Sequence, residues 1–244
     1  MTLRLVSAFL LGALCWCESA RAAQPTAERK AFEEVKARAQ KGEVEAQLDL
    51  AERYASGRGV TQDPKAAAKW HRTAAEQGLA RAQYLYGLVL AKGYGVKPDV
   101  EQAFEWIRKA AEQGMLEAQY ECAQRLLRGA GVKQSSVRAL EWFRKAADQE
   151  YPPAEYEVGR AYFEGSGVAK DTEEGLRWVR IAADHGFPAA QNKLGLCYMK
   201  GEVVEKDLVQ AYKWFNVAAG QGSETFTISA STWPKWKHSS RRTR

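Results

Sequence analysis

The chain has 244 residues, of which 45% are hydrophobic and 27% are charged, and its formal net charge is +6. This composition is ordinary for a soluble folded protein, and the length allows one or two domains or one elongated array. Residues 223–244 alone carry a net charge of +4. The basic character of the chain therefore gives little support to a nucleic-acid-binding fold, and we expect no nucleic-acid partner.

The first predicted element is a secretory signal peptide over residues 1–22. Arg4 precedes an apolar run over 5–16, and the run is followed by Ala-Arg-Ala at 20–22, a small-x-small pattern that a signal peptidase reads. The run is too short to span a bilayer comfortably, so we expect no transmembrane segment in the mature chain. Cleavage near Ala22 would yield a periplasmic or secreted protein, and an uncleaved anchor is the alternative.

From residue 43 onward the chain repeats itself with a period of 36 residues. Tryptophan recurs at this step, and so do an Ala-Ala pair, a single alanine and a glycine. Several independent columns hold one register, which is the signature of a repeat array. The five units span 43–78, 79–114, 115–150, 151–186 and 187–222.

Each unit is predicted to fold as two helices joined by a turn. In the first unit Ala46, Leu50 and Tyr54 share one helical stripe. We expect this helix to stop at Gly57 in a left-handed conformation, and the next helix to begin at the N-cap Asp63. The G-x-G turn resembles a phosphate loop, but it recurs in four of the five units and no G-K-[ST] follows it. We interpret the turn as structural and expect no cofactor.

The repeated motifs are A-x-A-Q-Y-x-x-G, G-x-G-V-x-x-D, A-x-x-W and A-A-E-Q-G, and they are most complete in residues 81–114. Together they resemble the Sel1-like repeat family, whose architecture is similar to that of tetratricopeptide repeats. The resemblance covers residues 42–222. It implies an all-α, right-handed α/α superhelical solenoid whose first helices line a concave face, and a role as an interaction scaffold.

The two ends of the array differ from the repeat. Residues 25–42 align with a second helix displaced by one period, which predicts an N-terminal capping helix within 23–42. Residues 223–244 match nothing in the repeat and are predicted to form a basic, poorly ordered tail, with an altered reading frame as one explanation. Such a tail could contact an anionic membrane or polymer.

Two units depart from the pattern at their turns. Glu150 replaces a glycine and is followed by Pro152 and Pro153, so we expect a reshaped junction between the third and fourth units. Val203 replaces the second glycine of the turn in the fifth unit, where we expect a different loop conformation.

The first helices differ from unit to unit on one face. The second unit has apolar residues where the first and third are charged, and tyrosines run beside them. Aromatic residues with an apolar centre and a charged rim suit a peptide-binding groove. Alternatively, the tyrosines cap the core between repeats, and Leu85 and Leu88 pack on a neighbouring helix. The candidate partner-binding residues are Tyr84, Leu85, Leu88, Val89, Tyr120, Gln124, Arg125, Tyr156 and Arg160.

No pattern indicates catalysis or a metal site. The histidines lack metal-ligand spacing, and no nucleophile motif occurs. His71 stands where other units have Ile, Phe or Val, which favours a buried position. Cys122 and Cys197 occupy unlike positions in non-adjacent units, so we expect no disulfide between them.

The leading hypothesis is an exported, non-enzymatic scaffold that binds a protein or peptide in its groove. The alternative is a cell-wall-active protein that binds or hydrolyses peptidoglycan or a β-lactam. Exported Sel1-like proteins linked to that chemistry carry paired cysteines in every repeat, and this sequence lacks those pairs.

Overall fold

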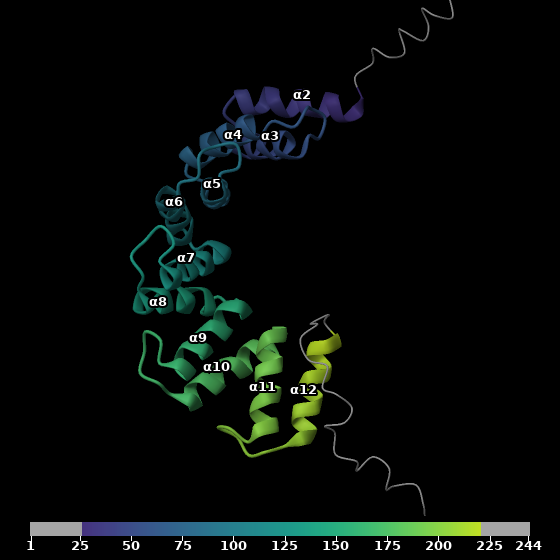
Figure 1. Ribbon diagram of the computed structural model, residues 1–244. Coiled ribbons are helices and arrows are strands. Elements are labelled where there is room, and N and C mark those ends of the chain that lie inside the picture. The colour runs from purple at the N-terminus through teal and green to yellow at the C-terminus, as the bar shows by residue number, and fades with distance from the viewer. Residues whose placement is uncertain (1–25, 221–244) are drawn as a thin grey trace, which may run out of the picture. The chain divides into compact units, whose positions relative to one another are not determined.

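The computed structural model describes residues 26–220, and every regular element in this range is an α-helix (Figure 1). The signal peptide and the basic tail predicted above therefore lie outside the described residues. The helices are α2 (Ala27–Gln40), α3 (Val44–Ser56), α4 (Pro64–Glu76), α5 (Ala80–Lys92), α6 (Val100–Glu112), α7 (Leu116–Arg128), α8 (Ser136–Ala147), α9 (Pro152–Glu164), α10 (Thr172–Asp184), α11 (Pro188–Lys200) and α12 (Leu208–Gly220).

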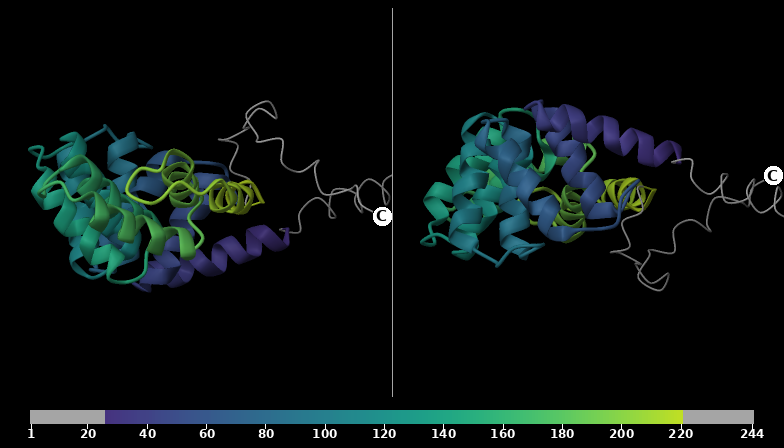
Figure 2. Two further views of the ribbon diagram at one scale, coloured as in Figure 1. Left: turned by 90° about the horizontal axis from the view of Figure 1, so that it is seen from below. Right: turned by 90° about the horizontal axis from the view of Figure 1, so that it is seen from above.

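The helices form two compact units, which divide between Gln113 and Gly114. Within each unit every helix packs against the next one along the chain, from α2 on α3 to α5 on α6, and from α7 on α8 to α11 on α12. In the further views of Figure 2, helices that follow one another within a unit also lie side by side. Stacking of helix pairs on sequence neighbours is how a solenoid buries its core. The predicted all-α solenoid is confirmed.

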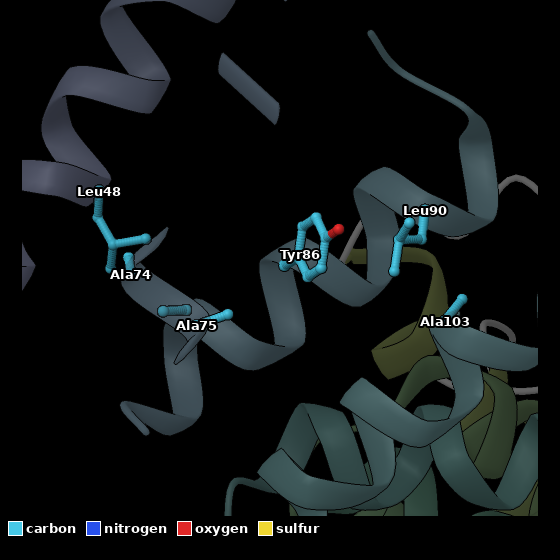
Figure 3. Packing of buried hydrophobic residues seen from close by; sticks show 7 residues of the cluster. Leu48, Ala74, Ala75, Tyr86, Leu90 and Ala103 are labelled. Carbon is cyan, nitrogen blue, oxygen red and sulfur yellow. The ribbon is translucent and has the colours of Figure 1, made fainter. Parts of the chain in front are cut away.

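Alanine columns allow the helices of neighbouring repeats to approach closely. In the first unit Ala74 and Ala75 of α4 are fully buried beside Leu48 of α3 and Tyr86 of α5, as Figure 3 shows. Alanine has no side chain beyond Cβ and is the best helix former, so it suits positions where two helix backbones meet. The core is therefore made of small residues, with larger side chains filling the gaps between them.

The tryptophan column lies at the edge of this core. Trp106 is half-buried, and its ring meets Tyr86 edge-on with the ring centroids 5.5 Å apart. The ammonium group of Lys109 covers the same ring at 4.1 Å from the centroid. The recurring tryptophan therefore seals the core from solvent rather than filling its centre.

The first helix of the described chain packs as an N-terminal cap. α2 buries Phe32 and Ala39, and the Phe32 ring meets Tyr54 of α3 edge-on at 5.5 Å between centroids. Glu34, which stands in the tryptophan position, is exposed. One face of α2 is thus apolar and the other is polar, as the end of an array in water requires.

Each turn between two helices of a repeat is closed by the same contacts. Gly57 has φ of +77° and caps α3, as predicted. The backbone N–H of Asp63 donates to the carbonyl of Tyr54 at 2.9 Å, while its side chain accepts from the N–H groups of Lys65 and Ala66 at 3.0 Å. The cap thus fixes both the end of one helix and the start of the next.

One expectation about the turns was wrong, and the other holds on a small scale. Val203 has φ of +68°, close to the +75° to +76° of the glycines at the same position in other repeats, so its loop keeps their conformation. Glu150 also has a positive φ, but its +59° differs from the +85° to +93° of the glycines at the same position, and α8 ends one residue earlier than the other second helices, so this junction is slightly reshaped. The helices packed on both sides of each turn hold Glu150 and Val203 at positive φ, although this conformation is strained for residues other than glycine.

Candidate functional site

Two hollows lie in the second unit, over its described residues 114–220. The first, of about 350 Å³, is lined by α7, α8, α9 and the loops that join them, and the second, of about 500 Å³, by α9, α10, α11 and their loops. Nine of the twelve lining positions of the first hollow recur 36 residues later in the second. The hollow is therefore a feature of the repeat itself.

The side chains that line the two hollows differ, although the positions are the same. The changes alter charge more than size, so the two hollows offer different chemistry on one frame. The main replacements from the first hollow to the second are Gln124 to Arg160, Arg128 to Glu164, Gln134 to Lys170 and Glu157 to Lys193.

Arg160 lines both hollows and is held by acidic neighbours on its own helix. Its Nη2 lies 2.6 Å from Oε2 of Glu157, and its Nη1 lies 3.5 Å from Oε1 of Glu164. In the first hollow Arg128 donates to the side-chain oxygen of Gln124 at 2.7 Å. These bonds orient the guanidinium groups along the helix surface, where a partner could reach them.

The structure brings some of the predicted binding residues together. Gln124 and Arg160 share the first hollow, and Tyr156 joins Arg160 in the second. Arg125 lies elsewhere: its side chain is 11% exposed and its Nε lies 2.9 Å from Oε1 of Glu121. The candidates of α5, which are Tyr84, Leu85, Leu88 and Val89, belong to the other unit, and all four are half-buried.

The tyrosines pack between aromatic residues. The Tyr120 ring centroid lies 5.4 Å from that of Phe143 and 5.6 Å from that of Tyr151, where the next repeat begins. Tyr156 meets Phe187 in the same way at 5.5 Å. Burial raises the pKa of both hydroxyl groups, those of Tyr120 and Tyr156. These contacts agree with the alternative in which the tyrosines cap the core between repeats.

The apolar residues of α5 divide into two groups. Leu85 and Val89 pack against the buried cluster of their unit, whereas Leu88 does not belong to it. The positions of Leu85 and Val89 carry an ion pair in the first repeat, where Asp49 and Arg53 lie 3.0 Å apart. These two repeat positions thus accept either an apolar pair or an ion pair. Leu88 occupies the repeat position of Gln124 in the first hollow and remains the strongest candidate on α5.

Much of the lining comes from residues that periodicity did not single out. Phe143 lies on a second helix, Ser136 at its start, and Gln134 in the loop before it. Gln134 donates from Nε2 to the carbonyl of Leu127 at 2.7 Å, which ties the loop to α7. The sequence held one signal for these residues, because Gln134 and its counterpart Lys170 vary in charge within an otherwise regular turn.

A recurring polar pair joins the two helices of each of the first four repeats, and its first-helix member is buried. Gln77 donates to Gln47 at 2.8 Å, Gln113 to Gln83 at 2.8 Å and Gln149 to Gln119 at 3.0 Å. In the next repeat the pair is His185 and Glu155, with Nδ1 2.8 Å from Oε1. Burial raises the pKa of Glu155, and the hydrogen bond from His185 opposes this shift. The recurring glutamine column is therefore a structural connection between the two helices of a repeat.

Within residues 26–220 no group of three or more His, Cys, Asp and Glu side chains is placed to hold a metal ion. No helix in this range combines the length and apolarity that crossing a membrane requires. Cys122 and Cys197 are buried and not joined by a disulfide.

The Sel1 repeat family model matches residues 44–79, 80–115, 116–151, 152–187 and 188–223, one residue later than the units counted above. The chain belongs to the Sel1 repeat family. Members of this family are generally protein-interaction scaffolds without enzymatic activity.

Two solved structures of Sel1 repeat proteins are similar to the chain. One is c5321, a protective antigen of uropathogenic Escherichia coli, with 38% sequence identity and a TM-score of 0.75; the match covers 78% of this chain and 41% of that one. The other is a Sel1 repeat protein from Oxalobacter formigenes, with 38% identity and a TM-score of 0.75, covering 82% of this chain and 57% of that one. This chain thus spans about half the length of these proteins. Comparison with curated proteins found no match.

Proposed function

We propose that this Sel1 repeat protein is an exported scaffold that binds an extended segment of a protein partner along α7, α9 and α11. The observation that carries the proposal is the recurrence of one hollow in consecutive repeats, with a constant frame and a variable lining. Similar sites at regular steps are best filled by a ligand that is itself a chain. Side chains spaced several residues apart along such a segment would enter successive hollows.

The character of the hollows supports a peptide rather than a buried small molecule. Their walls combine apolar residues such as Leu140 and Phe143 with the polar groups of Gln124 and Arg160. Small-molecule sites bury most of their ligand in mainly apolar pockets, whereas peptide grooves place apolar contacts beside hydrogen-bonding groups. In the other unit, Leu88 of α5 stands at the same repeat position as Gln124 and would offer an apolar contact of its own.

Site-specific photocrosslinking tests the proposal. A benzophenone amino acid at Gln124 should capture a discrete protein in cells that express the chain, because this position lines the first hollow. The matched control places the same group at Val137 of α8, which is 57% exposed and outside both hollows. Equal capture at the two positions, or no capture at Gln124, would contradict the proposed surface.

A substitution on α5 tests the contact proposed for the other unit. Leu88→Glu should leave the free energy of unfolding within about 1 kcal/mol, because Leu88 is half-buried and outside the core cluster. It should weaken capture of the partner by about 2 kcal/mol if Leu88 is a contact residue. Leu85→Glu is the matched control, since Leu85 packs on the core and its change should lower stability. Unfolding of both variants to the same extent would show that Leu88 is structural.

Export is the second part of the proposal. The Ala-Arg-Ala pattern at 20–22 supports it, and the similar protein from uropathogenic Escherichia coli is described as a protective antigen. Intact-mass measurement of the exported protein should give a chain that begins at Ala23. A mass that includes residues 1–22 would contradict cleavage at this position.

A further inference from the structure

The charges that line the second hollow are unevenly compensated. Arg160 is paired with Glu157 and Glu164, and Glu202 lies 3.6 Å from Nζ of Lys200. None of the ion pairs formed within residues 26–220 includes Lys170 or Lys193, although both line the hollow. Two lysines without a carboxylate partner thus line a hollow whose own carboxylates are already engaged.

The surroundings of Lys193 keep its ammonium group at the wall of the hollow. Its Nζ lies 4.9 Å from the centroid of the Phe163 ring, which attracts a cation without neutralising it. Lys193 is half-buried, and Val179 and Cys197 add an apolar floor beside it. A charge on a partly dry wall interacts more strongly with an incoming opposite charge than a charge in open water does.

The first hollow serves as an internal comparison. At the positions of Lys193 and Lys170 it has Glu157 and Gln134, so the same frame there offers an anion and a neutral amide. The second hollow gains positive charge at these two positions. It also gains two carboxylates, Glu164 and Glu202, but each of these is paired with a cation. Because the backbone frame is shared, the difference concerns recognition rather than folding.

We propose that the second hollow binds an acidic side chain, Asp or Glu, of an extended peptide, through Lys193 and Lys170 with Phe163 beneath. This rests on the proposed function, because it names the chemistry that one of its two hollows selects. A carboxylate fits the hollow of about 500 Å³ and would form charge-assisted hydrogen bonds with both ammonium groups. The first hollow, with balanced charge, would not share this preference.

Selection from a random peptide library tests the inference on the full chain. The probe is a library of 12-residue peptides displayed with their C-termini fused, so that no free terminal carboxylate competes. Wild-type protein should enrich peptides with Asp or Glu at one fixed position. Synthetic peptides with Gln in place of that residue should bind about five- to tenfold more weakly, and the difference should shrink at high salt.

Substitutions in the second hollow test whether Lys193 causes the acidic preference. Lys193→Glu should abolish the acidic preference or convert it to a basic one, and Lys193→Arg should retain it. Lys213→Gln, at an exposed position of α12 outside both hollows, is the matched control and should change nothing. Enrichment without any acidic preference, or a preference that Lys193→Glu leaves intact, would overturn the inference while the peptide scaffold stands. Peptides whose binding is also unaffected by Gln124→Ala and Arg160→Ala would instead contradict the proposed function.

Discussion

At the scale of single residues, the second glycine of three G-x-G turns is required by its neighbours as well as by its own backbone. Gly95 has φ of +75°, and a Cβ added to it would overlap the carbonyl group of Pro64 in the preceding repeat. Gly59 and Gly167 meet Glu28 and Ser136 in the same way. The turn is therefore a contact between consecutive repeats, which gives glycine a structural reason to recur there.

Replacement of Gly95 by alanine should separate these two requirements. Gly78 has φ of +93°, and a methyl group at its Cα would meet no atom within 4 Å, so Gly78→Ala measures backbone strain alone. Gly95→Ala adds overlap with Pro64 and should lower the free energy of unfolding by ~1–3 kcal/mol more than Gly78→Ala. Urea denaturation of both variants provides the comparison, and equal losses would show that contact with Pro64 is unimportant.

His71 should make the protein sensitive to acid. It is 7% exposed, and burial lowers its pKa from the ordinary value of 6.5. The unfolded chain therefore binds a proton at a higher pH than the folded chain does, so stability falls as the pH drops below 6.5 towards the folded pKa. His71→Phe, which introduces the residue found at Phe143 and Phe215, should remove this part of the decline. Denaturation between about pH 7 and pH 5 checks it, and parallel curves would contradict the prediction.

At the scale of elements, regular packing imposes the same loop on unlike sequences. Val203 follows α11 with φ of +68°, although a β-branched residue is disfavoured there. The helices on both sides and the backbone bond from Asp207 to Tyr198, 3.0 Å long, hold the loop in the shape that glycine adopts in the other repeats. The strain is thus local to one residue, and the element keeps its geometry.

Val203→Gly should therefore stabilise the protein. Removing the backbone strain of valine at positive φ should raise the free energy of unfolding by ~1–3 kcal/mol. The greater freedom of glycine in the unfolded chain offsets roughly 0.5–1 kcal/mol of this gain. A net gain of about 1 kcal/mol is expected in chemical denaturation. Val204→Gly, which removes a side chain packed on the core cluster of α10 and α11, is the control and should destabilise. A loss of stability in both variants would mean that Val203 is unstrained.

At the scale of the whole molecule, helices pack on their neighbours in the chain, so stability should be local. Leu194 of α11 is fully buried in the cluster that joins α10 and α11. Leu194→Ala should cost about 2–5 kcal/mol in this region. Hydrogen exchange should then rise in α9–α12 and remain unchanged in α2–α5. A uniform rise in all helices would show instead that the array unfolds as one unit.

The repeat could be predicted because its signals are local and numerous. A glycine that ends a helix, an aspartate that begins the next one and alanines on one face each act within a few residues, and the period aligns them. The departure at Val203 was misjudged because its conformation is decided by helices packed on either side of the turn. The role of Leu85 and Val89 was also not evident from the sequence, because their two half-buried positions accept an apolar pair in one repeat and a charged pair in another.

By itself, the sequence determined the helix pairs, the period and the family, since these follow from backbone preferences and from the spacing of apolar residues. Only the tertiary structure showed the two hollows, because each is built from three helices and their loops. A residue such as Arg160 lines both hollows only because the two hollows share helix α9. The charge that a hollow presents therefore depends on which side chains stacking brings together, as with Lys170 and Lys193, which both line the second hollow.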